Sequence, residues 1–239
     1  MALTDNLISY WKLDEATAAS RADSVGTNTL TDVNSVSQQT GKISNCAGFA
    51  SASSQKLTLS DNSSISTGDI DFTFSGWVYF TTLGAVRDLW TKWVDAGNQR
   101  EYLLLYNSGT NRLEWYVSNN GTAAVVVTAN NFGAPSTSTW YHVVTWHDSV
   151  NNQIGIAVNA GTADTASHTT GVFDSTATFA LGARNTSPAY HNGRIDELGF
   201  WKRVLTSTER TQLYNSGNGL AYPFAAGVPL FMHHRKQMT

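Results

Sequence analysis

The sequence predicts an all-β protein, a two-sheet antiparallel sandwich or a barrel, with one short helix near the C-terminal end. Only 14% of its 239 residues are charged, and 24 Ser, 29 Thr and 19 Asn make the chain unusually rich in uncharged polar residues. About a dozen short segments alternate between apolar and polar residues or are rich in β-branched and aromatic ones. Turn sequences such as NNG at 119–121 and HNG at 191–193 separate these segments.

The expected strands follow one another at short intervals along the chain. They cover residues 7–13, 48–49, 55–59, 72–80, 87–93, 101–106, 112–117, 124–128, 140–147, 153–158, 178–183 and 194–201. Residues 23–28 form a turn. In segment 113–117 the odd positions are all apolar, so we expect Trp115 in the core.

The predicted helix begins after Thr206. Thr206 and Glu209 have the spacing of a capping box, in which each side chain accepts a hydrogen bond from the other residue's backbone. The sequence NSG at 215–217 ends the helix. Residues 1–224 therefore form one domain, and residues 225–239 form an arm that is apolar at 228–232 and that we expect to contact a neighbouring subunit.

Charge and composition exclude several classes of protein. A net charge of −3 argues against nucleic acid, whose binding needs a basic surface. No apolar run approaches the ~18 residues of a membrane span. The single Cys46 has no internal disulfide partner, and we expect it to be buried at the start of a strand. The first ten residues have no signal-peptide pattern, so we expect export by another route, such as assembly into a virion.

Several motifs resemble one family in their order along the chain. They are LISYWKLDE (7–15), DSVG (23–26), DFTFSGWV (71–78), WYHVV (140–144) and GRIDELGFW (193–201). Together they resemble laminin-G-like domains of the concanavalin A-like lectin-glucanase group, which occur in phage virion and adhesion proteins. The resemblance implies a curved two-sheet jelly roll that binds sugars or proteins, with Trp11 and Trp140 packed inside.

Catalysis is not expected. Retaining glycoside hydrolysis needs two carboxylates about 5–5.5 Å apart, and the related glucanases supply them from one strand as Glu-x-Asp-x-x-Glu or a close variant. The five Glu residues lie at 15, 101, 114, 197 and 209, and no two are two, four or five positions apart. Asp69 and Asp71 have a suitable spacing, but they stand at the entry to a strand and no third carboxylate follows.

The predicted ligand site is a cluster of Trp90, Trp93, Arg100 and Tyr190, because sugars bind aromatic rings and a few well-placed polar groups. For each aromatic residue the alternative is a place in the core. A second candidate surface is the strand face that carries Trp77 and Tyr79.

The resemblance also implies a structural calcium ion, with Asp23 and Asp196 as ligands. The alternative is that Asp196 caps a turn or pairs with Arg194 or Arg203. We therefore expect a non-catalytic carbohydrate-binding or adhesion module that binds a glycan or cell-surface polysaccharide and is displayed on a phage particle or other surface assembly. The alternative is a purely structural virion decoration or fibre protein that contacts neighbouring subunits. A glycoside hydrolase is the least favoured interpretation.

Overall fold

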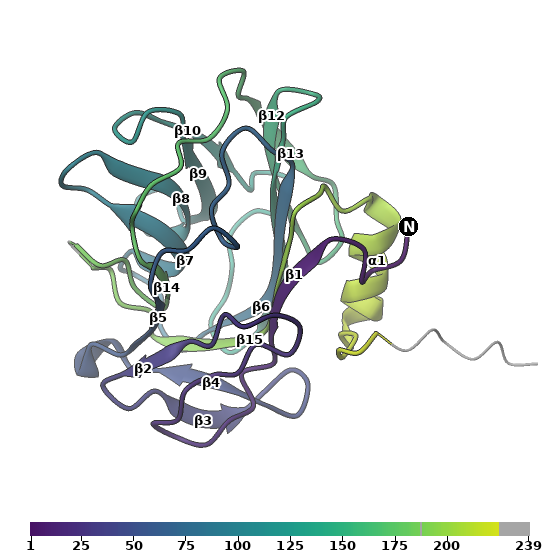
Figure 1. Cartoon of the computed structure of the whole chain (residues 1–239). Coiled ribbons are helices and arrows are strands. Elements are labelled where there is room, and N and C mark those ends of the chain that lie inside the picture. The colour runs from purple at the N-terminus through teal and green to yellow at the C-terminus, as the bar shows by residue number, and fades with distance from the viewer. Residues whose placement is uncertain (187, 225–239) are drawn as a thin grey trace, which may run out of the picture.

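Two antiparallel sheets pack face to face in the computed structural model, which describes residues 1–186 and 188–224 (Figure 1). This arrangement confirms the predicted sandwich. Each predicted strand is present, and three further short strands lie at sheet edges: β2 (Thr31–Val33), β3 (Ser37–Thr40) and β13 (Asp164–Ser167). The predicted C-terminal arm lies outside the described residues.

The larger sheet has eight strands in the order β13-β12-β11-β6-β15-β4-β3, and β1 also pairs with β15. Its strands are β1 (Leu7–Trp11), β3 (Ser37–Thr40), β4 (Asn45–Phe49), β6 (Phe72–Phe80), β11 (Trp140–Asp148), β12 (Gln153–Val158), β13 (Asp164–Ser167) and β15 (Gly193–Trp201). One side of β15 pairs with β6, whereas the other side pairs first with β4 and then with β1. A register shift after Asp196 marks the change between these two partners.

The smaller sheet has seven strands in the order β10-β9-β8-β7-β14-β5-β2. Its strands are β2 (Thr31–Val33), β5 (Lys56–Leu59), β7 (Arg87–Val94), β8 (Gln99–Asn107), β9 (Arg112–Ser118), β10 (Ala124–Thr128) and β14 (Phe179–Leu181). The helices are short: η1 (Ser51–Ser53), α1 (Ser207–Tyr214) and η2 (Asn215–Gly217). Among the helices of the described residues, none has the length and apolar character needed to cross a membrane.

Strand alternation builds the core between the sheets. On β6, Phe72, Phe74 and Phe80 point inward and are at most 1% exposed. The ring of Phe74 stacks on that of Phe200 of β15, with centroids 4.5 Å apart. Trp115 of β9 is fully buried in the same cluster, as predicted.

Helix α1 covers part of the outer face of the eight-stranded sheet. Thr206 and Glu209 form the predicted capping box, and the cap residue Asn215 ends the helix in a left-handed conformation. Tyr214 stacks on Trp77, and Arg210 lies 4.6 Å from the ring centroid of Trp146. This helix therefore covers Trp77 on the face that the sequence made a second candidate for ligand binding, whereas Tyr79 on the same face contacts Trp140 and Arg194.

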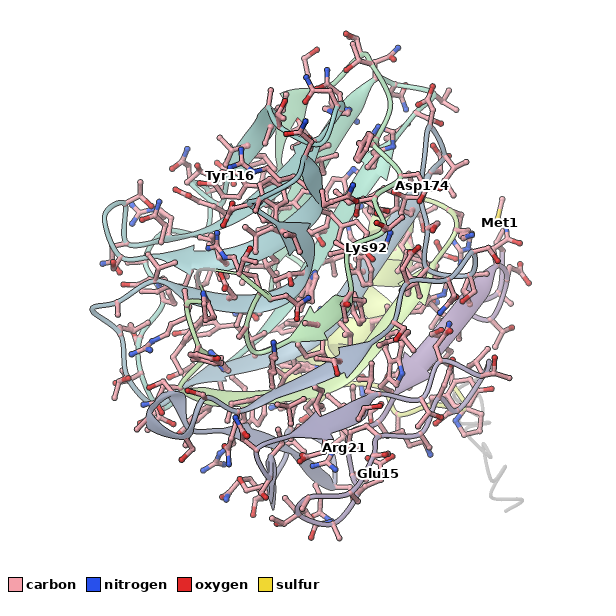
Figure 2. All side chains as sticks on the ribbon, turned by 60° about the vertical axis from the view of Figure 1, so that its left-hand side comes forward. Met1, Glu15, Arg21, Lys92, Tyr116 and Asp174 are labelled. Carbon is pink, nitrogen blue, oxygen red and sulfur yellow. The ribbon has the colours of Figure 1, made fainter. Side chains whose placement is uncertain are left out.

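A buried lysine joins two loops to the seven-stranded sheet (Figure 2). Lys92 of β7 is fully buried, and its ammonium group contacts Glu101, the carbonyl of Ser175 and, at 2.9 Å, Asp61. The carboxylate of Asp174 lies 3.8 Å away. Because four oxygen atoms surround one cation, the loops around Asp61 and Ser175 are fixed against the end of the sheet.

Candidate functional site

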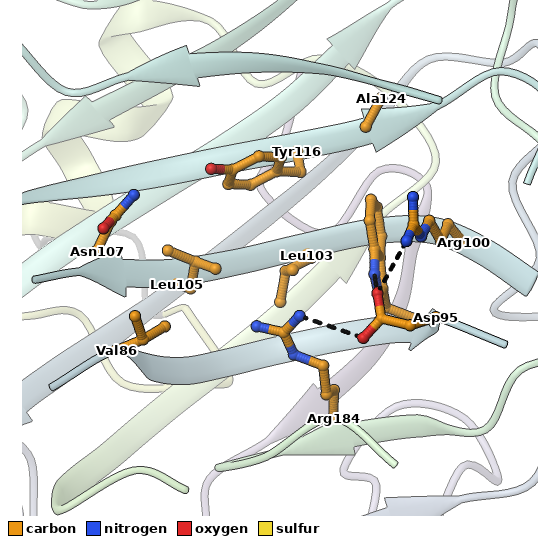
Figure 3. A pocket seen from close by; sticks show the side chains of 10 residues that line it. Val86, Asp95, Arg100, Leu103, Leu105, Asn107, Tyr116, Ala124 and Arg184 are labelled. Atoms are coloured by element: carbon orange, nitrogen blue, oxygen red, sulfur yellow. Dashed lines mark hydrogen bonds and ion pairs between the residues drawn. The ribbon is translucent and has the colours of Figure 1, made fainter. Parts of the chain in front are cut away.

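The candidate site is a groove of about 370 Å³ on the outer face of the seven-stranded sheet, which we call the β7–β10 groove (Figure 3). Strands β7, β8, β9 and β10 supply most of its lining, and the loops around β7 and after β14 supply the rest. The lining residues are Val86, Trp93, Asp95, Arg100, Leu103, Leu105, Asn107, Tyr116, Ala124 and Arg184.

The floor of the groove is apolar. Leu103 and Leu105 alternate on β8 with the core residues Tyr102 and Leu104, so their side chains point away from the core. They pack with Trp93 of β7, and Tyr116 of β9 completes this outer cluster. The sheet therefore has a second, smaller apolar cluster on the side opposite the core.

One end of the groove carries two ion pairs that share Asp95. Its carboxylate lies 3.3 Å from the guanidinium of Arg100 and 3.6 Å from that of Arg184, and it accepts a hydrogen bond from the indole of Trp93. Arg184 also makes a two-pronged contact with the buried carboxylate of Asp88, with bonds of 3.0 and 2.9 Å. Two arginines thus face two aspartates, and the end has no net charge.

Arg100 lies over Trp93 because the two residues are direct partners across β7 and β8. Its guanidinium is 5.5 Å from the ring centroid of Trp93. The side chain remains 32% exposed. Arg100 is therefore oriented by the protein but still accessible to a ligand.

Tyr116 and Asn107 stand at the other end and share one acceptor. Both donate hydrogen bonds to the same oxygen of Glu114, at 2.6 and 2.9 Å. Burial and the Glu114 carboxylate raise the pKa of Tyr116 above its usual value, so the phenol stays protonated. The groove thus combines an apolar floor with polar groups fixed at both ends.

A match to a known protein family agrees with the two-sheet architecture. Residues 51–209 match the family model for the concanavalin A-like lectin/glucanases superfamily. This chain belongs to that superfamily. Among curated proteins, none matches the chain.

Solved structures of low sequence identity share the superfamily fold. The binding domain of Paraclostridial Mosquitocidal Protein 1 superimposes with a TM-score of 0.72 at 19% identity, over 90% of this chain and 53% of that one. Domain 4 of AbnA, an arabinanase from Geobacillus stearothermophilus, superimposes with a TM-score of 0.65 at 18% identity. The match covers 86% of this chain and 97% of that one. The botulinum neurotoxin serotype C1 binding domain superimposes with a TM-score of 0.65 at 15% identity, over 89% of this chain and 52% of that one. The chain thus spans about half the length of the two toxin domains.

The structure brings together two of the four residues that the sequence grouped as a ligand site. Trp93 and Arg100 meet in the groove, but Trp90 is fully buried in the core. Because Trp90 and Trp93 are three positions apart on one strand, alternation turns them to opposite faces, and the grouping of Trp90 was wrong. Tyr190 is half-buried and is not part of the groove lining; its carbonyl accepts a hydrogen bond from Arg87.

The many tryptophans of this superfamily member serve mainly to pack the fold. Seven of the eight are buried, and Trp140 is half-buried. Trp11 packs inside, as the resemblance implied, whereas Trp140 lies on the outer face of the eight-stranded sheet beside Tyr79. Tryptophan content therefore gives no support for a sugar site here, and the shape and polarity of the groove carry that argument.

Four important groove residues were missed by the sequence interpretation. Tyr116 could have been found, because it alternates with the core residue Trp115. Asp95 and Asn107 lie in or next to turns, where polar residues are expected for other reasons. Arg184 comes from a distant loop, and only the fold places it next to Asp95.

The two predicted calcium ligands act as acceptors for backbone N–H groups. Asp23 accepts from Tyr10, Val25 and Asn28. Asp196 accepts through one oxygen from Lys42 and Ile43, while its other oxygen is buried without a partner. Among the described residues no group of three His, Cys, Asp or Glu side chains could hold a metal ion. Calcium binding stays a prediction from the resemblance.

Asp196 and the adjacent Glu197 form a buried acidic pair. Burial raises the pKa of Asp196 to about 8 and that of Glu197 to about 7. Glu197 also has a positive φ of 50°, at the register shift of β15. Of the alternatives for Asp196, the turn cap is the one present, because Arg203 pairs with Glu209 instead.

Proposed function

We propose that the chain is a non-catalytic carbohydrate-binding module and that the β7–β10 groove holds its ligand. The observation that carries the proposal is the apolar floor of the groove, which lies between two sets of fixed polar groups on the outer face of a sheet. The carbon–hydrogen face of a sugar ring fits the floor formed by Leu103, Leu105 and Trp93. Hydroxyl groups of the sugar would meet Arg100 and Tyr116 at the two ends.

The electrostatic balance of the groove favours a neutral sugar. Arg100 and Arg184 are matched by Asp95 and Asp88, so an anionic ligand gains no unpaired cation there. A neutral sugar instead uses these groups as hydrogen-bond donors and acceptors. The proposed ligand class is therefore a neutral oligosaccharide.

Relatives of known structure support a role in binding. The arabinanase domain was solved in complex with arabinotriose. Botulinum neurotoxin type C is described as entering cells through interaction with two ganglioside molecules. These ligands belong to those proteins, and for this chain the neutral arabinotriose is the first sugar to test.

The acids near the groove support a binding role rather than hydrolysis. Asp95 is held by two arginines and an indole, and Glu114 accepts from Thr110, Asn107 and Tyr116. Each carboxylate is committed to partners within the protein. This arrangement favours binding over glycoside hydrolysis, which requires a pair of carboxyl groups that face the substrate.

The test is a screen of the purified chain on an oligosaccharide array that includes arabinotriose and other neutral glycans. Each glycan that binds is then measured by isothermal titration calorimetry with the wild type and the groove variant Arg100→Ala. Binding that this variant weakens supports the proposal. Binding that the variant leaves unchanged, or an array with no signal above background, contradicts it. Display on a phage particle or other surface, and contacts with virion subunits, stay predictions.

A further inference from the structure

A second concave site lies on the other sheet, and we call it the β4–β15 hollow. It encloses about 230 Å³ on the eight-stranded sheet, where β3, β4 and β15 adjoin (Figure 1). Its lining is Ser37, Gln39, Gly48, Phe49, Ala50, Thr81, Gly193 and Arg194. The side chains that line it are mostly polar, in contrast to the apolar floor of the groove.

Arg194 is the only charged side chain in this lining, and no carboxylate opposes it. Among the described residues no ion pair involves Arg194. Asp196 is the next residue on the same face of β15, but it is buried and accepts the N–H groups of Lys42 and Ile43. The hollow therefore presents an unmatched positive charge, whereas both arginines of the groove are matched.

The guanidinium of Arg194 is held in place from two sides. It lies 4.7 Å from the ring centroid of Tyr79, its neighbour on β6, and one of its nitrogens donates to the carbonyl of Thr40 at 3.0 Å. Trp140 supports Tyr79 from β11, with ring centroids 5.4 Å apart. One hydrogen bond uses a single N–H of the five that an arginine offers, so most of the fork remains available.

Three other side chains of the lining, those of Ser37, Gln39 and Thr81, can recognise hydroxyl groups. Ser37 and Gln39 come from β3 and are linked by a hydrogen bond of 3.2 Å, and Thr81 stands exposed after β6. Gly48 lies beneath them, since a Cβ atom there would be 2.6 Å from the hydroxyl oxygen of Ser37. An arginine fork matches a carboxylate with two parallel hydrogen bonds, and hydroxyl and amide groups match the ring hydroxyls of a sugar.

We propose that the β4–β15 hollow binds an acidic sugar, with Arg194 pairing with its carboxylate and Ser37, Gln39 and Thr81 contacting its hydroxyls. This site is separate from the β7–β10 groove in position and in ligand charge. The proposal does not depend on the function proposed for the groove. A chain with both sites would hold neutral and acidic sugars on opposite faces of the sandwich.

The test is an NMR titration of the full chain with glucuronate, with glucose as the neutral probe. The signals followed are the side-chain N–H groups of Arg194 and Trp140. Glucuronate should shift both signals and glucose should shift neither. Absence of any shift with glucuronate, or equal shifts with glucose, overturns the proposal.

Variants separate recognition from charge alone. Arg194→Gln should weaken glucuronate binding about 10- to 100-fold, because the charged hydrogen bonds are lost. Arg194→Lys keeps the positive charge and the contact with Tyr79 but loses the fork, so it should also bind at least several-fold more weakly. The control Arg112→Gln alters another half-buried arginine, on β9, and should bind like the wild type. Equal affinity in the wild type and Arg194→Gln refutes the proposal.

The groove variant Arg100→Ala keeps the two proposals distinguishable. It should bind glucuronate with wild-type affinity, because Arg100 lies on the other sheet. Failure of neutral sugars to bind would then leave the result for the hollow unaffected. Loss of glucuronate binding in Arg100→Ala would place the acidic ligand in the groove and overturn the assignment to Arg194.

Discussion

Replacing Arg100 by alanine separates ligand binding from folding better than any other change in the groove. The side chain makes one partly exposed ion pair with Asp95 at 3.3 Å, one contact with the ring of Trp93 and one hydrogen bond to the carbonyl of Thr122. An exposed ion pair contributes about 0–1 kcal/mol, and an exposed cation–π contact about 0.5–1 kcal/mol. With about 0.5–1.5 kcal/mol for the hydrogen bond to Thr122, we expect Arg100→Ala to lower the free energy of unfolding by no more than about 3 kcal/mol.

The effect on ligand binding is measured separately from the effect on stability. A hydrogen bond from a charged group to a ligand contributes about 1.5–3 kcal/mol, which corresponds to a loss of about 10- to 150-fold in affinity. Isothermal titration calorimetry with the best array ligand measures this loss. Urea unfolding of the same preparation shows that the variant is folded.

Arg210→Ala is the matched control. Arg210 also lies over a tryptophan ring, that of Trp146, but it belongs to α1 on the other sheet. It should bind the neutral ligand like the wild type. If Arg100→Ala also keeps wild-type affinity, or if both variants lose it equally, the assignment of the ligand to the groove is refuted.

Three further predictions concern buried groups. The pKa of Asp196 in the folded state is raised to about 8, so its contribution should make the free energy of unfolding fall as pH rises from about 4 to 8. Urea unfolding of Asp196→Asn at several pH values should show a smaller slope. An unchanged slope contradicts this. Lys92→Met leaves Glu101 buried without its partner and should cost about 3–5 kcal/mol at pH 7; a loss below about 1 kcal/mol would argue against the buried ion pair. Gly155→Ala places a Cβ atom 2.1 Å from the ring of Trp146 and should cost about 1–3 kcal/mol in thermal unfolding, whereas wild-type stability would show that the ring moves freely.

Local sequence patterns were sufficient for the elements whose stability is local. The capping box of Thr206 and Glu209 depends on residues three positions apart, and the structure contains it. The core face of β6 follows from alternation alone. Cys46 is buried on β4, as its small neighbours suggested.

The edge strands β3 and β13 were missed because their composition gives no signal. Residues Ser37–Thr40 of β3 and Asp164–Ser167 of β13 are mostly polar and pair on one side only. They are strands because a longer strand next to them supplies the hydrogen-bonding partners. The sequence alone does not reveal that neighbour.

The candidate site could be predicted only in part, because its members come from separate segments. Trp93 and Arg100 are seven residues apart and meet across one hairpin, which a strand-turn-strand pattern can suggest. Arg184 joins them only through the fold. Trp77 could not be interpreted from its strand alone. Strand alternation placed it on a face that was a candidate for ligand binding, but Tyr214 of α1 stacks on its ring.

The most direct test of sugar binding in the groove is an NMR titration of the wild type with the best neutral oligosaccharide from the array. We expect the largest shifts on the side-chain signals of Trp93, Arg100, Leu103 and Tyr116. Shifts confined to residues outside the β7–β10 groove would contradict it.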